Sequence, residues 1–372
     1  MNAATRLSGA QLFWLLTLFT IGMSGFLTIA PAIRRAHNDA WMSMTLNLLV
    51  STFLTFVSVR TALSYPGETL VQYSQSIVGK WVGRAVSLLY LLHWTTLAGV
   101  IVRQTSDFLM TSEFHRTPPW VFIISMVAVV LYLLHKGGLD SLGRIALLIG
   151  PLVMGVMLMT VWLSVPDGRL TRLLPLYFAN GGSAILQGAL PVFGYAGNGV
   201  AVGMLLPFVK NAKRNAYMAV WGVAAACLFL IGAAAQVVAV FGSDLPAAMW
   251  NPIFDLTRFI SVADFVEEIE PFVIVFWFIS AVIRLSFLTF IASYGWSQLF
   301  QSSRAWPFLW AVGLITTVEA FLPRNIVYSS ILYSRTVVEV WVAPVLFVAV
   351  PLLFWFVSGV KTRRTLGGSR RR

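Results

Sequence analysis

The chain has 372 residues, of which 58% are hydrophobic and only 11% are charged. Soluble domains carry about 25% charged residues, so the composition excludes a soluble protein and indicates an integral membrane protein. The net charge of +12 does not indicate a nucleic-acid partner, because no folded basic domain with interleaved aromatic residues is present.

Apolar runs long enough to cross a bilayer as helices follow one another along the chain. They cover residues 11–33, 41–60, 85–109, 119–135, 143–165, 183–207, 215–241, 268–299, 306–322 and 340–359. The first run is too long for the apolar part of a signal peptide, so we interpret it as a retained span. Residues 243–267 are polar and acidic and are predicted to form a surface loop with one or two short helices.

Spans 1 and 6 are interrupted in their middles by small and polar residues, at 21–26 and 191–199. Unwound backbone at membrane depth survives only where it is buried in protein or lines a cavity. Broken helices at corresponding places in two halves mark the binding site in many transporters. The sequence therefore predicts an all-α membrane fold of about ten helices, in two inverted five-helix repeats with helices 1 and 6 broken.

The interruption in span 1 supplies Gly22, Ser24 and Gly25 as candidate ligand-binding residues. Freed amides there would suit a carboxylate, and freed carbonyls an ammonium group or an ion. The alternative is that these small residues only allow close packing of helices.

The interruption in span 6 supplies Gly194, Tyr195, Gly197 and Asn198. Tyr195 offers a hydroxyl over a pocket, and the Asn198 amide can both donate and accept hydrogen bonds. The alternative is a kinked helix that serves packing alone.

Span 8 adds Arg284, which could reach a ligand carboxylate or bond backbone carbonyls, and Ser286. Serine in a span more often bonds back to its own helix. The predicted pocket lies near mid-membrane between spans 1, 3, 6 and 8. Arg103 and Asp107, four residues apart in span 3, are interpreted as a structural ion pair.

No catalytic constellation, cofactor motif or metal-ligand spacing is visible, so we expect no enzyme, no cofactor and no metal. The single cysteine, Cys227, permits no disulfide within the chain. His93 in span 3 could face the cavity and is the one plausible proton-coupling group in the spans; the interpretation as a packing histidine is favoured.

The basic residues outside the spans divide 16 to 8 between the two sides, which places both termini in the cytoplasm. We expect a single transmembrane domain at 1–360 and a basic cytoplasmic tail at 361–372 that contacts anionic lipid.

Several stretches together resemble the B subunit of the bacterial spore germinant receptor, the endospore germination permease family, a branch of the amino acid–polyamine–organocation superfamily. They are the interrupted first span with 36–41, the segments 65–70 and 77–83, Arg103 with Asp107, the segment 190–195, and 265–271. Glu268 departs from the pattern, because the family usually has arginine there. The resemblance implies a ten-span inverted-repeat fold, a small nutrient germinant, and assembly with A and C subunits in the inner membrane of the spore.

Three functions remain open at this point. The first is a germinant-sensing subunit that binds a small nutrient, with an amino acid as the first candidate and a nucleoside or sugar next. The second is an active amino-acid permease coupled to an ion gradient. The third is a membrane scaffold, which the interrupted spans argue against. The near absence of acidic residues and lysine from the span interiors favours sensing over proton-coupled transport.

Overall fold

The computed structural model describes residues 7–175, 181–259, 270–325 and 327–369; the side chains of 23–26, 195–198 and 362–369 are outside this description. Every regular element in these ranges is helical, and only one isolated bridge pairs Leu7 with Val209. The α-helices are α1 Gly9–Ala36, α2 Ala40–Leu63, α3 Leu70–Val78, α4 Lys80–Ser112, α5 Pro119–Leu163, α6 Gly181–Ala196, α7 Val202–Leu205, α8 Ala212–Asn215, α9 Met218–Phe241, α10 Asp244–Ala248, α11 Pro252–Phe259, α12 Glu270–Leu299, α13 Trp306–Phe321 and α14 Val350–Ser369.

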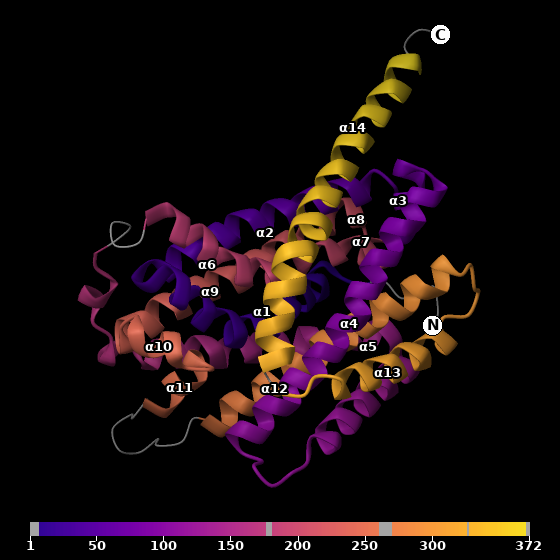
Figure 1. Cartoon of the computed structure of the whole chain (residues 1–372). Coiled ribbons are helices and arrows are strands. Elements are labelled where there is room, and N and C mark those ends of the chain that lie inside the picture. Colours follow the sequence, from indigo (N-terminus) through magenta and orange to yellow (C-terminus); the bar gives the residue numbers. More distant parts are fainter. Residues whose placement is uncertain (1–6, 176–180, 260–269, 326, 370–372) are drawn as a thin grey trace.

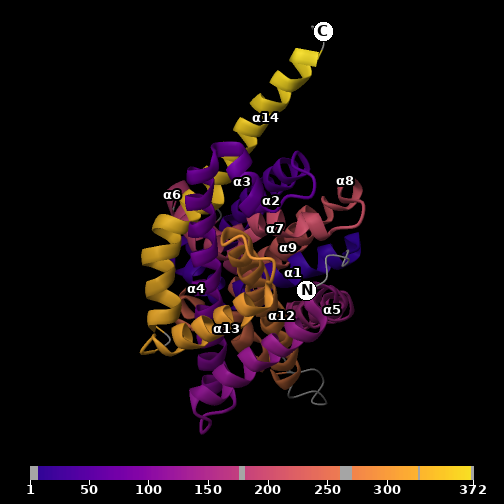
Figure 2. The same cartoon turned by 90° about the vertical axis from the view of Figure 1, so that its right-hand side faces the viewer.

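Wider π-helical turns at Val327–Leu332 and Ser334–Ala349 lead into α14. We call residues 327–361 the last span, because they form one apolar stretch. This span begins earlier than the predicted residue 340. α14 projects beyond the packed helices in both views (Figures 1 and 2).

The helices match the predicted spans. In the described residues, seven helical stretches are long and apolar enough to cross a membrane, and the first part of α1 (Gly9–Gly22) and α13 (Trp306–Phe321) are shorter apolar stretches. The stretch Pro119–Asp167 contains predicted spans 4 and 5, which meet at Gly138. Gly138 has a φ of +54°, a conformation that favours glycine, and it redirects the chain between the two spans. The short helices α10 and α11 confirm the predicted helices in the described part of 243–267, but most of α11 is buried against the bundle, so this part is not the predicted surface loop.

Many large apolar side chains remain on the surface, including Leu148 and Trp162, each 71% exposed. Soluble proteins rarely expose apolar surface on this scale. Lipid covers it in a multi-pass membrane protein, which is the class that the hydropathy of the spans indicates.

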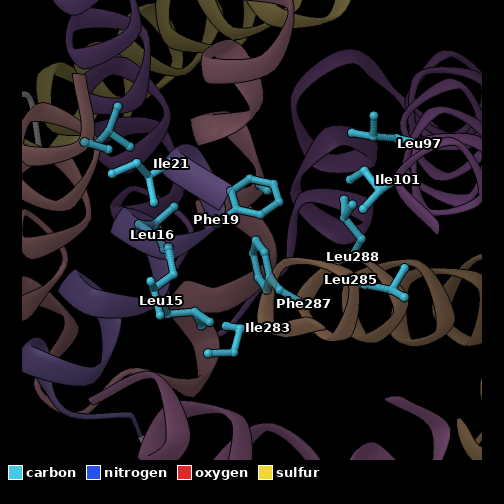
Figure 3. Close-up of a cluster of buried hydrophobic side chains, with 14 of the residues drawn as sticks. Leu15, Leu16, Phe19, Ile21, Leu97, Ile101, Ile283, Leu285, Phe287 and Leu288 are labelled. Atoms are coloured by element: carbon cyan, nitrogen blue, oxygen red, sulfur yellow. The ribbon is translucent and has the colours of Figure 1, made fainter. Parts of the chain in front are cut away.

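Inside the bundle, α12 packs on both α1 and α4, and buried apolar side chains of the three helices gather there (Figure 3). The rings of Phe19 in α1 and Phe287 in α12 meet edge to face, with centroids 4.6 Å apart. On the other side of α1, the Thr17 hydroxyl lies 3.1 Å from the carbonyl oxygen of Gly222 in α9 and donates to it. These contacts hold α1 between α9 and α12.

Candidate functional site

The predicted interruption of span 1 is not present in this structure. α1 runs as one helix from Gly9 to Ala36, through residues 22–25. Gly22 is buried against α12, and a Cβ atom built on it would lie 3.4 Å from the carbonyl oxygen of Ser280. α1 therefore packs on α12 at Gly22, as in the packing alternative, although a separation of 3.4 Å is an ordinary van der Waals contact that an alanine would also make.

The predicted interruption of span 6 is confirmed. α6 ends at Ala196, a 3₁₀ helix follows at Gly197–Ala201, and α7 resumes at Val202. Because the hydrogen-bond pattern changes inside a buried span, backbone groups of this segment are released from regular α-helical pairing.

Glycines bring the interrupted span close to two neighbouring helices. A Cβ atom on Gly194 would lie 2.6 Å from Cγ1 of Val338 in the last span. A Cβ atom on Gly199 would overlap the Thr55 hydroxyl of α2. α6 also packs directly on α1. The 3₁₀ segment is thus enclosed by protein, which is the condition for irregular backbone at membrane depth.

Arg284 of α12 is fully buried and lies against α1. Its guanidinium carbon is 5.2 Å from the centroid of the Phe19 ring, a cation–π contact one helical turn before Gly22. The structure thus places Arg284 and Gly22 at the same α1–α12 contact. A buried cation there is costly unless something compensates it.

Ser286 is also buried in α12, and its hydroxyl donates to the carbonyl oxygen of Val282 at 2.8 Å. In this structure its hydroxyl is thus used within its own helix. The side chains of Ser24, Tyr195 and Asn198, and the surroundings of Gly25 and Gly197, lie outside the description. Their assignment to a ligand stays a prediction.

Arg103 and Asp107 form the expected ion pair, with Nε and Oδ1 2.9 Å apart. His93 packs edge to face on Phe347 with ring centroids 5.5 Å apart, and it also lines a cavity with Thr96 and Trp341, so it serves both packing and a cavity wall. Among the described residues, no group of three or more His, Cys, Asp and Glu side chains could hold a metal ion.

An ion pair that the sequence did not predict joins α1 to the last span. The Arg35 guanidinium donates to the Glu339 carboxylate at 2.9 Å, across 304 positions of sequence. These two side chains line a recess with Leu27, Pro31, Arg34, Pro191, Trp250, Ser330, Ile331, Ser334 and Arg335. The only signal in the sequence was the Arg34-Arg35 pair at the end of span 1, which was counted only toward topology.

An interrupted sixth span, enclosed by α1, α2 and the last span of an all-helical membrane bundle, is an arrangement found in transporters. A comparison of the sequence with known protein families identifies the family. A family described as "Spore germination protein" matches residues 6–329. The chain belongs to this family.

Two relatives from Bacillus subtilis (strain 168) cover most of this germination protein. Spore germination protein KB is 25% identical over 316 residues, covering 83% of this chain and 83% of the relative. Spore germination protein YndE is 24% identical over 307 residues, which cover 81% of this chain and 83% of the relative.

Solved structures share the fold at low identity. MhsT in complex with L-phenylalanine has a TM-score of 0.61 at 14% identity and covers 94% of this chain and 88% of MhsT. A mutant of the Eremococcus coleocola manganese transporter has a TM-score of 0.58 at 14% identity, and the match covers 93% of this chain and 76% of the transporter. The germination protein therefore has the all-helical fold of these transporters, and the continuous α1 is the point at which it departs from the prediction.

Proposed function

We propose that this chain is a germinant-sensing subunit that binds a small nutrient, with an amino acid as the first candidate, between α1, α4, the α6–α7 break and α12. The observation that carries the proposal is the family match across residues 6–329 of a chain with a transporter fold. The enclosed 3₁₀ segment at Gly197–Ala201 supplies backbone groups for recognition. Arg284 supplies a cation at the neighbouring α1–α12 contact.

The proposed mechanism is a shift of conformational population. A ligand that binds one arrangement of the helices more tightly favours that arrangement, and A and C subunits would read the change. No enzymatic step is part of this mechanism. The proposed location is the inner membrane of the spore, with both termini in the cytoplasm and the basic tail on anionic lipid.

Charges inside the described spans leave one carboxyl without an ion pair. Asp107 is paired with Arg103, whereas the Glu319 carboxylate accepts a hydrogen bond from Thr96 at 3.0 Å through one oxygen and has its other oxygen buried without a hydrogen-bond partner among the described residues. Arg284 holds its proton too firmly to exchange it in a transport cycle. Glu319 is therefore the group that a proton-coupled permease would use, and the uptake test below decides between the two functions.

The test combines uptake with germination. The purified chain in proteoliposomes should bind a labelled amino acid and should not accumulate it under a proton or sodium gradient. Spores that carry the chain as their only subunit of this type should germinate in response to that amino acid. Concentrative uptake by the chain alone would instead establish the active amino-acid permease.

A further inference from the structure

The recess at the end of α1 has an excess of positive charge. Three arginines line it (Arg34, Arg35 and Arg335) against the single carboxylate of Glu339. That carboxylate is paired with Arg35, whose exposed side-chain fraction is 19%, against 9% for Glu339. Three positive charges against one negative charge leave a net charge of two, so the recess attracts anions.

Two hydrogen-bond donors in the lining lack an acceptor in the described part of the chain. Nε of Arg34 and Oγ of Ser330 are both buried there without a hydrogen-bond partner. Arg335, whose side chain is exposed, forms no ion pair with any described residue. Buried donors in folded proteins are normally satisfied, so an oxyanion would supply both the missing acceptors and the missing negative charge.

Stabilisation of α1 by itself explains only part of this arrangement. Arg34 and Arg35 lie in the last turn of α1, where the helix dipole favours cations. That effect does not account for Arg335 on the last span or for the Ser330 hydroxyl.

The position and size of the recess limit what it takes. Leu27 and Pro31 of α1 and Pro191 of α6 form its walls, so it lies between the two helices that flank the proposed nutrient site. Its cavity volume is about 30 Å³. One water molecule needs roughly 10–15 Å³, so the recess has room for a group of carboxylate size and not for a whole nutrient molecule.

We infer that this recess is an anion site that receives the carboxylate of a soluble ligand on its way to the segment at Gly197–Ala201. This inference rests on the proposed function and narrows its ligand to carboxylates, which disfavours neutral nucleosides and sugars. The paired Arg35 and Glu339 form one wall, and Arg34, Arg335 and Ser330 bind the anion.

Formate is the probe, because it is a carboxylate without a side chain, and formamide is its neutral counterpart. The full chain in phosphatidylcholine nanodiscs is titrated with each at constant ionic strength, and the thermal midpoint is recorded. A bound ligand raises the midpoint in a saturable way. Formate should do so and formamide should not.

Variants connect the response to the recess. Arg34→Gln and Arg335→Gln should each weaken the apparent affinity for formate by about 5-fold or more, because each removes a charge-assisted contact. Arg335 is exposed, so its replacement leaves the packed core intact. Arg116→Gln, an exposed arginine in the loop before α5, is the matched control and should leave the formate response unchanged.

Three results would overturn the inference: equal responses to formate and formamide, an unchanged formate response in both recess variants, or loss of the response when phosphatidylglycerol replaces part of the phosphatidylcholine. The last result would assign the site to a lipid phosphate. The titration contains no nutrient, so its failure leaves the proposed function standing. Conversely, a formate response that depends on Arg34 and Arg335, with no germination by any small nutrient, would contradict the proposed function alone.

Discussion

Individual charges inside the bundle are held by specific contacts. Arg103 and Asp107 pair within one turn of α4, with only 12% and 10% of their side chains exposed. A buried pair gives little net stability, but removal of one partner leaves the other uncompensated. The pair therefore adds little stability, but a substitution of either residue alone is expected to destabilise α4.

Arg103→Met alone should lower the free energy of unfolding by about 1–3 kcal/mol, because the Asp107 carboxylate loses its donor. Arg103→Met combined with Asp107→Leu should recover much of that loss. Denaturant titration of the purified protein measures both. Additive losses in the double variant would show that the two side chains act independently.

Asp255 in α11, outside the spans, should make stability depend on pH. Burial raises the pKa of its carboxyl above the ordinary value; the Arg258 guanidinium lowers this pKa and the Glu270 carboxylate raises it. A raised folded-state pKa means that the folded protein binds the proton more tightly than the unfolded chain. The stabilisation is thus complete below the unfolded pKa, near pH 4, and is lost as pH rises through the folded pKa.

Asp255→Asn mimics the protonated form and should raise the thermal midpoint at pH 7, with a benefit that shrinks toward pH 4. Midpoints measured at several pH values test this. Asp244→Asn, at an exposed position in α10, is the control and should show no such trend. A benefit of Asp255→Asn that is the same at every pH would refute the assignment to burial.

At the scale of the elements, glycines set how closely the helices approach. Gly194 brings α6 against Val338 of the last span, and Gly199 brings the 3₁₀ segment against Thr55 of α2. Both contacts lie beside the proposed nutrient site, so a larger side chain at either glycine would displace the α6 break.

Gly194→Ala should lower the free energy of unfolding by about 1–3 kcal/mol, because the new methyl group overlaps Val338. Adding Val338→Ala should restore much of the loss. Gly155→Ala, in α5 where no described atom lies within 4 Å of the added Cβ, is the control. If Val338→Ala gave no rescue, the close contact of α6 with the last span would be wrong.

Hydropathy was sufficient to locate the spans, because a bilayer requires long apolar helices. It placed the start of the last span too late, because Arg335 and Glu339 interrupt the apolar run while facing the recess. The break in span 6 was predictable from poor helix formers at Gly197, Asn198 and Gly199. The continuity of α1 was not, because Gly22 and Gly25 suit an unwound segment and a packing contact equally well.

The recess was beyond sequence reasoning for a different reason. Arg35 and Glu339 are 304 positions apart, and only the packing of α1 on the last span brings them together. Helical periodicity relates residues within a turn or two, so it predicted the Arg103–Asp107 pair and could not predict this one.

At the scale of the whole molecule, α14 carries the basic tail away from the bundle (Figure 1). Lys361, the first tail residue, donates through Nζ to the carbonyl oxygens of Ser76 and Ile77, at 2.8 and 2.9 Å. These carbonyls belong to the last turn of α3, so Lys361 caps that helix. A truncation that tests lipid contact therefore has to keep Lys361.

Removal of residues 362–372 should weaken binding to vesicles that contain phosphatidylglycerol, since each basic residue near an anionic surface contributes about 1 kcal/mol. The thermal midpoint in detergent should not change. Lys361→Ala in the full chain should show the opposite pattern, with a lower midpoint and nearly normal vesicle binding. A truncated chain that bound these vesicles as tightly as the full chain would contradict a role of the tail in lipid contact.

Equilibrium binding of labelled L-amino acids to the purified chain in nanodiscs tests the central claim most directly. We predict saturable binding of at least one amino acid, which Asn198→Leu weakens at least 10-fold, about 1.4 kcal/mol, while the thermal midpoint is retained. Leu186→Val, on an exposed face of α6, should bind like the unaltered chain. No binding of any amino acid by folded protein, or equal binding by Asn198→Leu, would contradict a nutrient site at the α6 break.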